Sequence, residues 1–296
     1  IIPCLTILIC IYFRPDKSLY KHIFGGFLLQ TGACLSYLLI RYEIFGILGV
    51  PGVDGFIKNR PLLNMYFNIT KIFFDYLRIA IWPVNLSCDY PVKPIENPHL
   101  SGLVFPLLIC VGISSLFHPN KKYRLFGFCF FWFFVALMPV LHFVPIQIAL
   151  AERLLFPAFI GIVIFIVAVI SKFRNGFPFI FTCIIIFMGY ITFQRCFDWY
   201  DNTSLWQQTL KTTPNSYRAN IYLGNKSAKE QKTEKALNYY LEAANLKPNR
   251  NNEIILEYNK AVVYLKRNDV SRAITCIRKV LELAPDHKPS FLLLGD

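Results

Sequence analysis

Hydrophobic residues along this chain form long runs in the first two thirds and a shorter helical rhythm in the last third. Five mostly apolar runs lie at 23–40, 100–117, 125–144, 154–170 and 177–193. Each is close to the ~20 residues that a membrane-spanning helix needs. Beyond residue 198, apolar positions recur at helical spacing among charged residues, which is typical of amphipathic helices. The pattern predicts an all-α protein, with a polytopic transmembrane helix bundle over 1–197 and a helical solenoid over 198–296.

Basic residues concentrate in three linkers between these runs, at 14–21, 121–124 and 172–174. The positive-inside rule places such linkers in the cytoplasm. Residues 41–99, the short loop at 147–153 and the solenoid then share the external or lumenal side. Because much of the net charge of +13 flanks apolar runs, it indicates a membrane protein and does not indicate a nucleic-acid partner.

The run at 65–86 does not fit this topology if it crosses the bilayer, because the basic linker at 121–124 would then emerge on the wrong side. Lys71, Asp75 and Arg78 fall on one helical face, and apolar residues cover the others. This pattern favours a helix lying in the membrane interface. The alternative is a true span whose charges pair inside the bundle.

The last third repeats a pattern of small and large residues that is characteristic of tetratricopeptide helix pairs. The positions that match are Leu223, Gly224, Ala236, Tyr240, Ala243 and Pro248 in one unit, Ala261, Tyr264, Ala273, Val280 and Pro285 in a second unit, and Phe291, Leu294 and Gly295 in an incomplete third. Such pairs stack into a curved solenoid that binds proteins or extended segments. The first helices carry candidate partner-facing residues, namely Asn220, Lys226, Glu257, Asn259 and Lys260.

Motifs for soluble enzyme chemistry do not occur: the sequence has no Walker loop, Rossmann glycine pattern, HExxH or nucleophile elbow. The nine cysteines include no CxxC pair, so we expect neither a disulfide framework nor a metal site. Four N-x-S/T sequons begin at Asn68, Asn85, Asn202 and Asn225. All four fall on the predicted external side, which favours a secretory-pathway lumen over a periplasm.

Three stretches together resemble a known family. They are Arg60-Pro61-Leu62-Leu63 through Tyr66, Trp82-Pro83 and Asp89-Tyr90-Pro91, then Ala151-Glu152-Arg153-Leu154-Leu155-Phe156-Pro157, and finally the lead-in to the first repeat with Leu205-Trp206. In this order they are similar to the transmembrane and tetratricopeptide repeat-containing proteins. Phe156 departs from the family pattern, in which Tyr is usual.

The resemblance implies a GT-C type glycosyltransferase in the endoplasmic reticulum membrane, multi-pass, with lumenal repeats that recognise an acceptor protein. It implies O-mannosylation of that protein from dolichyl phosphate mannose, with no cofactor beyond this lipid-linked donor. The acidic residues of the superfamily usually sit in a first lumenal loop, which would lie N-terminal to Ile1. The catalytic residues are therefore expected to lie outside this chain, which is expected to be a fragment that is inactive by itself.

Glu152 and Arg153 are the sharpest site candidates, because both ionise just before the apolar run at 154–170. Charge at membrane level is costly unless it is paired or used. An arginine can hold a lipid phosphate through two parallel N–H bonds, and Arg60 is a further candidate for that phosphate. His142 and Gln147 flank the same loop and are candidates for lining the cavity.

Two alternatives stay open from the sequence. Glu152 and Arg153 would also suit an interfacial pair that anchors the end of a helix by snorkelling. The whole chain would equally suit a non-catalytic adaptor, in which the spans anchor a tetratricopeptide scaffold in the membrane.

Overall fold

The computed structural model describes residues 1–45, 62–90, 100–141, 150–172, 177–246 and 248–295. All regular structure in these ranges is helical, which confirms the predicted fold class at that level. The chain divides into two compact units, which are described separately. Unit 1 comprises Ile1–Val84 and Val92–Ile191, and unit 2 comprises Asn85–Pro91 and Thr192–Asp296.

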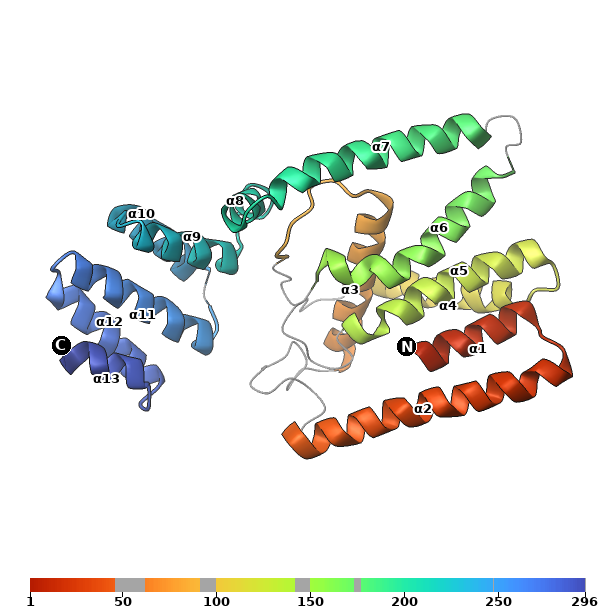
Figure 1. Cartoon of the computed structure of the whole chain (residues 1–296), viewed down its shortest axis with the longest axis horizontal. Coiled ribbons are helices and arrows are strands. Elements are labelled where there is room, and N and C mark those ends of the chain that lie inside the picture. Colours follow the sequence, from red (N-terminus) through yellow and green to blue (C-terminus); the bar gives the residue numbers. More distant parts are fainter. Residues whose placement is uncertain (46–61, 91–99, 142–149, 173–176, 247, 296) are drawn as a thin grey trace. The chain divides into compact units, whose positions relative to one another are not determined.

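Unit 1 consists mainly of apolar helices (Figure 1). They are α1 (Ile2–Phe13), α2 (Lys17–Phe45), α3 (Leu62–Ile81), α4 (Leu100–Phe117), α5 (Lys121–Leu137), α6 (Phe156–Ile170) and most of α7 (Phe177–Asp198), with two 3-10 turns, η1 (Met138–Val140) and η2 (Glu152–Leu155). α5 packs between α4 and α6. The predicted domain boundary at 197/198 lies within the last turn of α7, and unit 2 resumes earlier in that helix, at Thr192.

Glycines allow these three helices to pack closely. A Cβ atom on Gly127 of α5 would lie 2.4 Å from the backbone nitrogen of Leu116 in α4. A Cβ atom on Gly161 of α6 would lie 2.7 Å from the carbonyl oxygen of Cys129 in α5. Small residues at helix crossings are typical of packing between membrane helices, where backbone approach replaces the hydrophobic drive.

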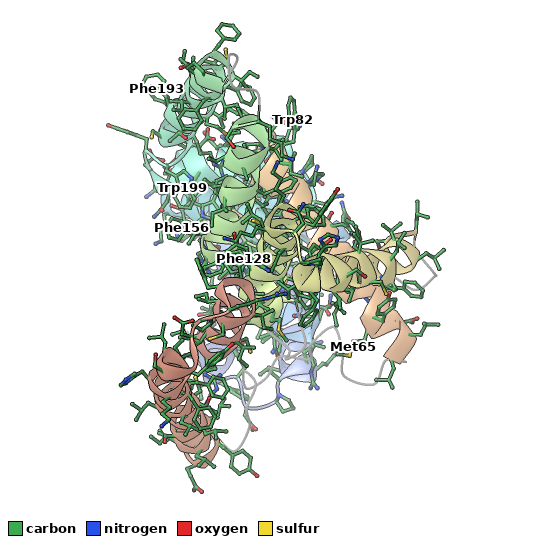
Figure 2. All side chains as sticks on the ribbon, turned by 90° about the vertical axis from the view of Figure 1, so that its right-hand side faces the viewer. Met65, Trp82, Phe128, Phe156, Phe193 and Trp199 are labelled. Atoms are coloured by element: carbon green, nitrogen blue, oxygen red, sulfur yellow. The ribbon has the colours of Figure 1, made fainter. Side chains whose placement is uncertain are left out.

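Five helices in the described part of the chain are long and apolar enough to cross a membrane: Ser18–Ile44, Leu100–Phe117, Lys121–Val140, Glu152–Ile170 and Pro178–Asp198. They correspond to the five apolar runs of the sequence. Figure 2 shows the mostly carbon side chains that project from the helices. The most apolar windows of Ser18–Ile44 and Pro178–Asp198 contain no buried residue.

α3 is not among these candidate spans. It is amphipathic, and its apolar residues include some of the most deeply buried in unit 1, such as Ile72, Phe73 and Tyr76. Lys71 and Asp75 pair on its partly exposed side, with 3.8 Å between Nζ and Oδ2. Its placement in the membrane interface stays a prediction.

Unit 2 is built from α8 (Asn202–Thr212), α9 (Tyr217–Lys229), α10 (Thr233–Asn245), α11 (Arg250–Lys266), α12 (Val270–Leu283) and α13 (Lys288–Gly295). Side-chain caps start several of these helices: Asp201, Ser216, Asn249 and Asp269 each accept a hydrogen bond from a backbone N–H in the first turn. α9 pairs with α10 and α11 with α12. The first helix of the second pair is longer, with 17 residues against 13 in α9.

Candidate functional site

The Glu152–Arg153 pair lies on the 3-10 turn η2, directly before α6. Ala151 precedes the turn in an extended conformation, and its carbonyl accepts a hydrogen bond from the Leu154 N–H at 3.0 Å. Pro157 lies in the first turn of α6, where a missing N–H is harmless. The sequence therefore presents Glu152 and Arg153 at the start of a candidate span.

Tyr76 of α3 holds this turn in place. Its side chain is fully buried, and its hydroxyl oxygen accepts a hydrogen bond from the Ala151 N–H at 3.2 Å. Burial raises the pKa of Tyr76 above the ordinary value, while the hydrogen bond from Ala151 and the positive charge of Arg153 act in the opposite direction. Arg153 thus lies close enough to Tyr76 for its charge to lower the pKa of the tyrosine. Arg153 itself is exposed, and Glu152 is half-buried.

Arg60, His142 and Gln147, the remaining predicted site residues, lie outside the residues that the structure describes. Within the described ranges, no group of three or more His, Cys, Asp or Glu side chains is arranged to hold a metal ion. Of the predicted site, the structure therefore describes Glu152 and Arg153 on the η2 turn, and it adds Tyr76 as a support for that turn.

The repeats show why their small residues are needed. A Cβ atom on Gly224 of α9 would lie 2.4 Å from Cε1 of Tyr240 in α10, so the tyrosine ring packs directly on the glycine backbone. The Tyr240 hydroxyl donates to Oδ1 of Asn225 at 2.7 Å, and the Asn259 amide of α11 donates to the same oxygen at 3.0 Å. This arrangement connects the two helix pairs through Asn225.

Two of the predicted partner-facing residues turn out to be internal. Asn220 is buried, and its amide donates to the carbonyl of Ser216 at 3.0 Å. The Glu257 side chain is only 6% exposed and pairs with Lys260 at 3.0 Å and with Lys279 at 3.1 Å. Burial raises the pKa of Glu257, but hydrogen bonds and charge from the two lysines outweigh it, and the net pKa lies below the ordinary value. The predicted role for Asn220 and Glu257 was wrong because helical position alone does not say which face is covered.

The other predicted partner-facing residues also have partners within the repeats. Asn259 bonds to Asn225, as described above, and Lys260 pairs with Glu257. The ammonium of Lys226 donates to the Thr203 hydroxyl of α8 and pairs with Glu230 at 3.8 Å. These side chains stabilise the packing of the helices in unit 2.

Sequence reasoning left Asp89 without an assignment, although it has a defined partner. Its carboxylate accepts a hydrogen bond from the Ser216 hydroxyl at 2.7 Å. The sequence offered only the residue types as an indication. A serine before the first repeat helix, here Ser216, is a typical helix cap, and an acidic side chain such as Asp89 is favoured beside the start of a helix. Nothing in the sequence pairs positions that lie 127 residues apart.

A family model described as Tetratricopeptide repeat matches residues 258–287. A search of the curated proteins and a search of the solved structures both find no match. The matched stretch covers the C-terminal half of α11 and all of α12, which are the helix pair that the sequence pattern predicts as the second repeat. Residues 258–287 are therefore a tetratricopeptide repeat.

Proposed function

We propose that this chain belongs to a membrane-embedded glycosyltransferase of the endoplasmic reticulum, which transfers mannose from dolichyl phosphate mannose to a lumenal protein. In this proposal the transmembrane helices form part of a GT-C bundle. The repeats recognise the acceptor protein.

The observation that carries the proposal is the position of Arg153. It is exposed, it lies on the first turn of the candidate span Glu152–Ile170, and the support from Tyr76 fixes the backbone beside it. A guanidinium at membrane level is costly without a partner. A polyprenyl phosphate arriving from the bilayer supplies one, because its oxygens match the two parallel N–H groups of an arginine.

Two further observations support a membrane enzyme with a protein acceptor. The windows of α2 and α7 that contain no buried residue expose far more apolar surface than a soluble protein normally carries. The tetratricopeptide repeat at 258–287 is a module for binding proteins.

The test is transfer of labelled mannose from dolichyl phosphate mannose to lumenal proteins, in membranes that contain the full-length protein. Arg153→Ala should abolish transfer, and Arg153→Lys should restore only part of it because lysine lacks the bidentate geometry. Lys172→Ala is the matched control, since Lys172 is an exposed cation just beyond the opposite end of α6. Equal transfer by the Arg153→Ala and Lys172→Ala variants would refute the assignment of Arg153.

A membrane-anchored adaptor remains the second candidate, because a tetratricopeptide repeat on apolar spans meets its requirements as well. The same assay separates the two functions. Absence of transfer by the unsubstituted protein, together with capture of a lumenal protein by the repeats, would favour the adaptor.

A further inference from the structure

Residues 85–90, which we call the docked segment, belong to unit 2 even though α8 begins more than a hundred residues later. Ser87 within the segment is 1% exposed. Its hydroxyl donates to the Asp89 carbonyl at 2.9 Å, and its N–H donates to the Tyr90 hydroxyl at 2.8 Å. These internal bonds give the segment a fixed shape of its own.

Four side chains of unit 2 hold the docked segment. At its start, Arg195 of α7 donates from Nη1 to the Leu86 carbonyl at 3.2 Å. In its middle, Cys88 Sγ lies 3.1 Å from Thr209 Oγ1 of α8, and Thr209 is 1% exposed. The other two side chains, Ser216 and Arg218, contact the carboxylate of Asp89.

The carboxylate of Asp89 lies at the start of α9. Ser216 is the cap of that helix and is fully buried: its hydroxyl oxygen accepts from the Ala219 N–H at 3.1 Å while its proton is donated to Asp89 Oδ2 at 2.7 Å. Arg218 Nη1 lies 3.8 Å from Asp89 Oδ1. A negative charge here is favoured by the helix dipole, the hydroxyl donor and the guanidinium together.

We propose that Arg195, Thr209, Ser216 and Arg218 form an interaction surface for a short bent segment that presents one aspartate, and that residues 85–90 are its built-in ligand. The surface anchors the polypeptide that leaves α3 to the first repeat. Because this surface is already occupied, a partner protein has to bind the repeats elsewhere. The proposal holds for an enzyme and for an adaptor alike.

The direct test uses the thiol of Cys88. Thr209→Cys places a second thiol where an oxygen now lies 3.1 Å from Cys88 Sγ. A small side-chain rotation then reaches the ~2.05 Å of a disulfide. In the full chain, purified in detergent and treated with a mild oxidant, peptide mass spectrometry should find Cys88 linked to the introduced thiol.

Two controls make the result specific. Thr212→Cys lies on the same helix, but its hydroxyl bonds to the carbonyls of Gln208 and Thr209 in α8 itself, so it should not link to Cys88. Thr209→Cys combined with Cys88→Ser should give no link. Absence of the Cys88 link in a folded Thr209→Cys variant, or equal linking through Thr212→Cys, would overturn the proposal.

A second measurement covers the case in which Thr209→Cys fails to fold. Asp89→Asn keeps the shape of the side chain but removes the charge that Ser216 and Arg218 recognise. Hydrogen exchange of the backbone amides at 86–89 should then accelerate about 10- to 100-fold, as expected for loss of a charge-assisted hydrogen bond. Glu234→Gln is the control, because Glu234 is 83% exposed on α10. Unchanged exchange in Asp89→Asn would refute the proposed recognition of Asp89.

The experiments also distinguish this proposal from the proposed function. The linkage in detergent depends only on the docked segment, whichever side of a membrane unit 2 occupies. If the Thr209→Cys link also forms in cells without added oxidant, the repeats lie in an oxidising compartment, as the proposed function requires.

Discussion

Gly224 offers the sharpest test of how the repeats pack. A Cβ atom at this position would lie 2.4 Å from Cε1, 2.7 Å from Cδ1 and 3.2 Å from Cζ of Tyr240. Tyr240 is 1% exposed, and its hydroxyl bonds to Asn225. The ring therefore has little free space, and Gly224→Ala has to displace either the ring or the facing helix.

The expected change in the free energy of unfolding is the sum of opposing contributions. Overpacking in a buried site destabilises by ~1–3 kcal/mol, and displacing the ring also weakens the hydrogen bond from Tyr240 to Asn225, by about 0.5–1.5 kcal/mol. Against this, alanine favours a helix over glycine by ~1 kcal/mol. We expect Gly224→Ala to destabilise α9 and α10 by about 1–3 kcal/mol, which corresponds to a roughly 5- to 150-fold loss of protection from hydrogen exchange.

The measurement is hydrogen exchange of residues 217–245 in the full chain. Gly189→Ala is the matched control, because a Cβ atom on this helical glycine of α7 meets no atom within 4 Å. In a Tyr240→Ala background the clash is gone, so Gly224→Ala should become neutral or stabilising by up to ~1 kcal/mol. An equal loss of protection with and without the Tyr240 ring would refute the reasoning.

Three further predictions follow from buried polar groups. Tyr76→Phe leaves the Ala151 N–H without its acceptor, at a cost of ~1–3 kcal/mol, which should appear as faster exchange of that amide. Burial raises the pKa of Tyr240 to about 12, so the folded repeats hold this proton more tightly than the unfolded chain. The stability of the repeats should therefore fall between pH 10 and 12, by at most about 3 kcal/mol, and Tyr240→Phe should remove this dependence on pH. Glu257→Gln should destabilise the repeats by about 2–3 kcal/mol, which is less than for a fully buried pair because Lys279 is half-exposed. Because the pKa of Glu257 is lowered in the folded state, the stability that this carboxylate contributes should be lost as the pH falls below 4.5. The Glu257→Gln variant should not show this loss.

Local patterns in the sequence predicted many of the helices and one of the repeats. The five candidate spans were predictable because the length and apolarity of a run depend only on consecutive residues. The repeat at 258–287 was predictable because small and large residues recur at fixed spacing, and the packing of Tyr240 on Gly224 shows the physical reason. The separate character of α3 was indicated by Lys71, Asp75 and Arg78 on one face.

Contacts between distant parts of the sequence could not be predicted. Helical spacing places Asn220 and Glu257 on first helices, but their burial depends on which neighbouring helix covers them. The bond from Ser216 to Asp89 joins residues that share no periodic pattern. For the predicted site, the structure adds the support that Tyr76 gives to Ala151, which links α3 to a turn 75 residues later.

The docked segment bears on the choice between an enzyme and an adaptor. An adaptor needs a single covalent link between membrane helices and repeats, and α7 followed by α8 supplies it. Unit 2 nevertheless incorporates a second stretch of chain, which begins only four residues after α3 ends at Ile81. Fixing that stretch adds nothing to anchorage, but it would tie the backbone beyond α3 to the first repeat. α3 also carries Tyr76, which supports the turn that presents Arg153. In the proposed transferase, which would have to bring a donor and an acceptor together, such a link would join the repeats to the helix that supports Arg153. Locking the docked segment through Thr209→Cys should therefore leave mannose transfer intact, whereas releasing it through Asp89→Asn should reduce transfer even though Asp89 need not touch either substrate.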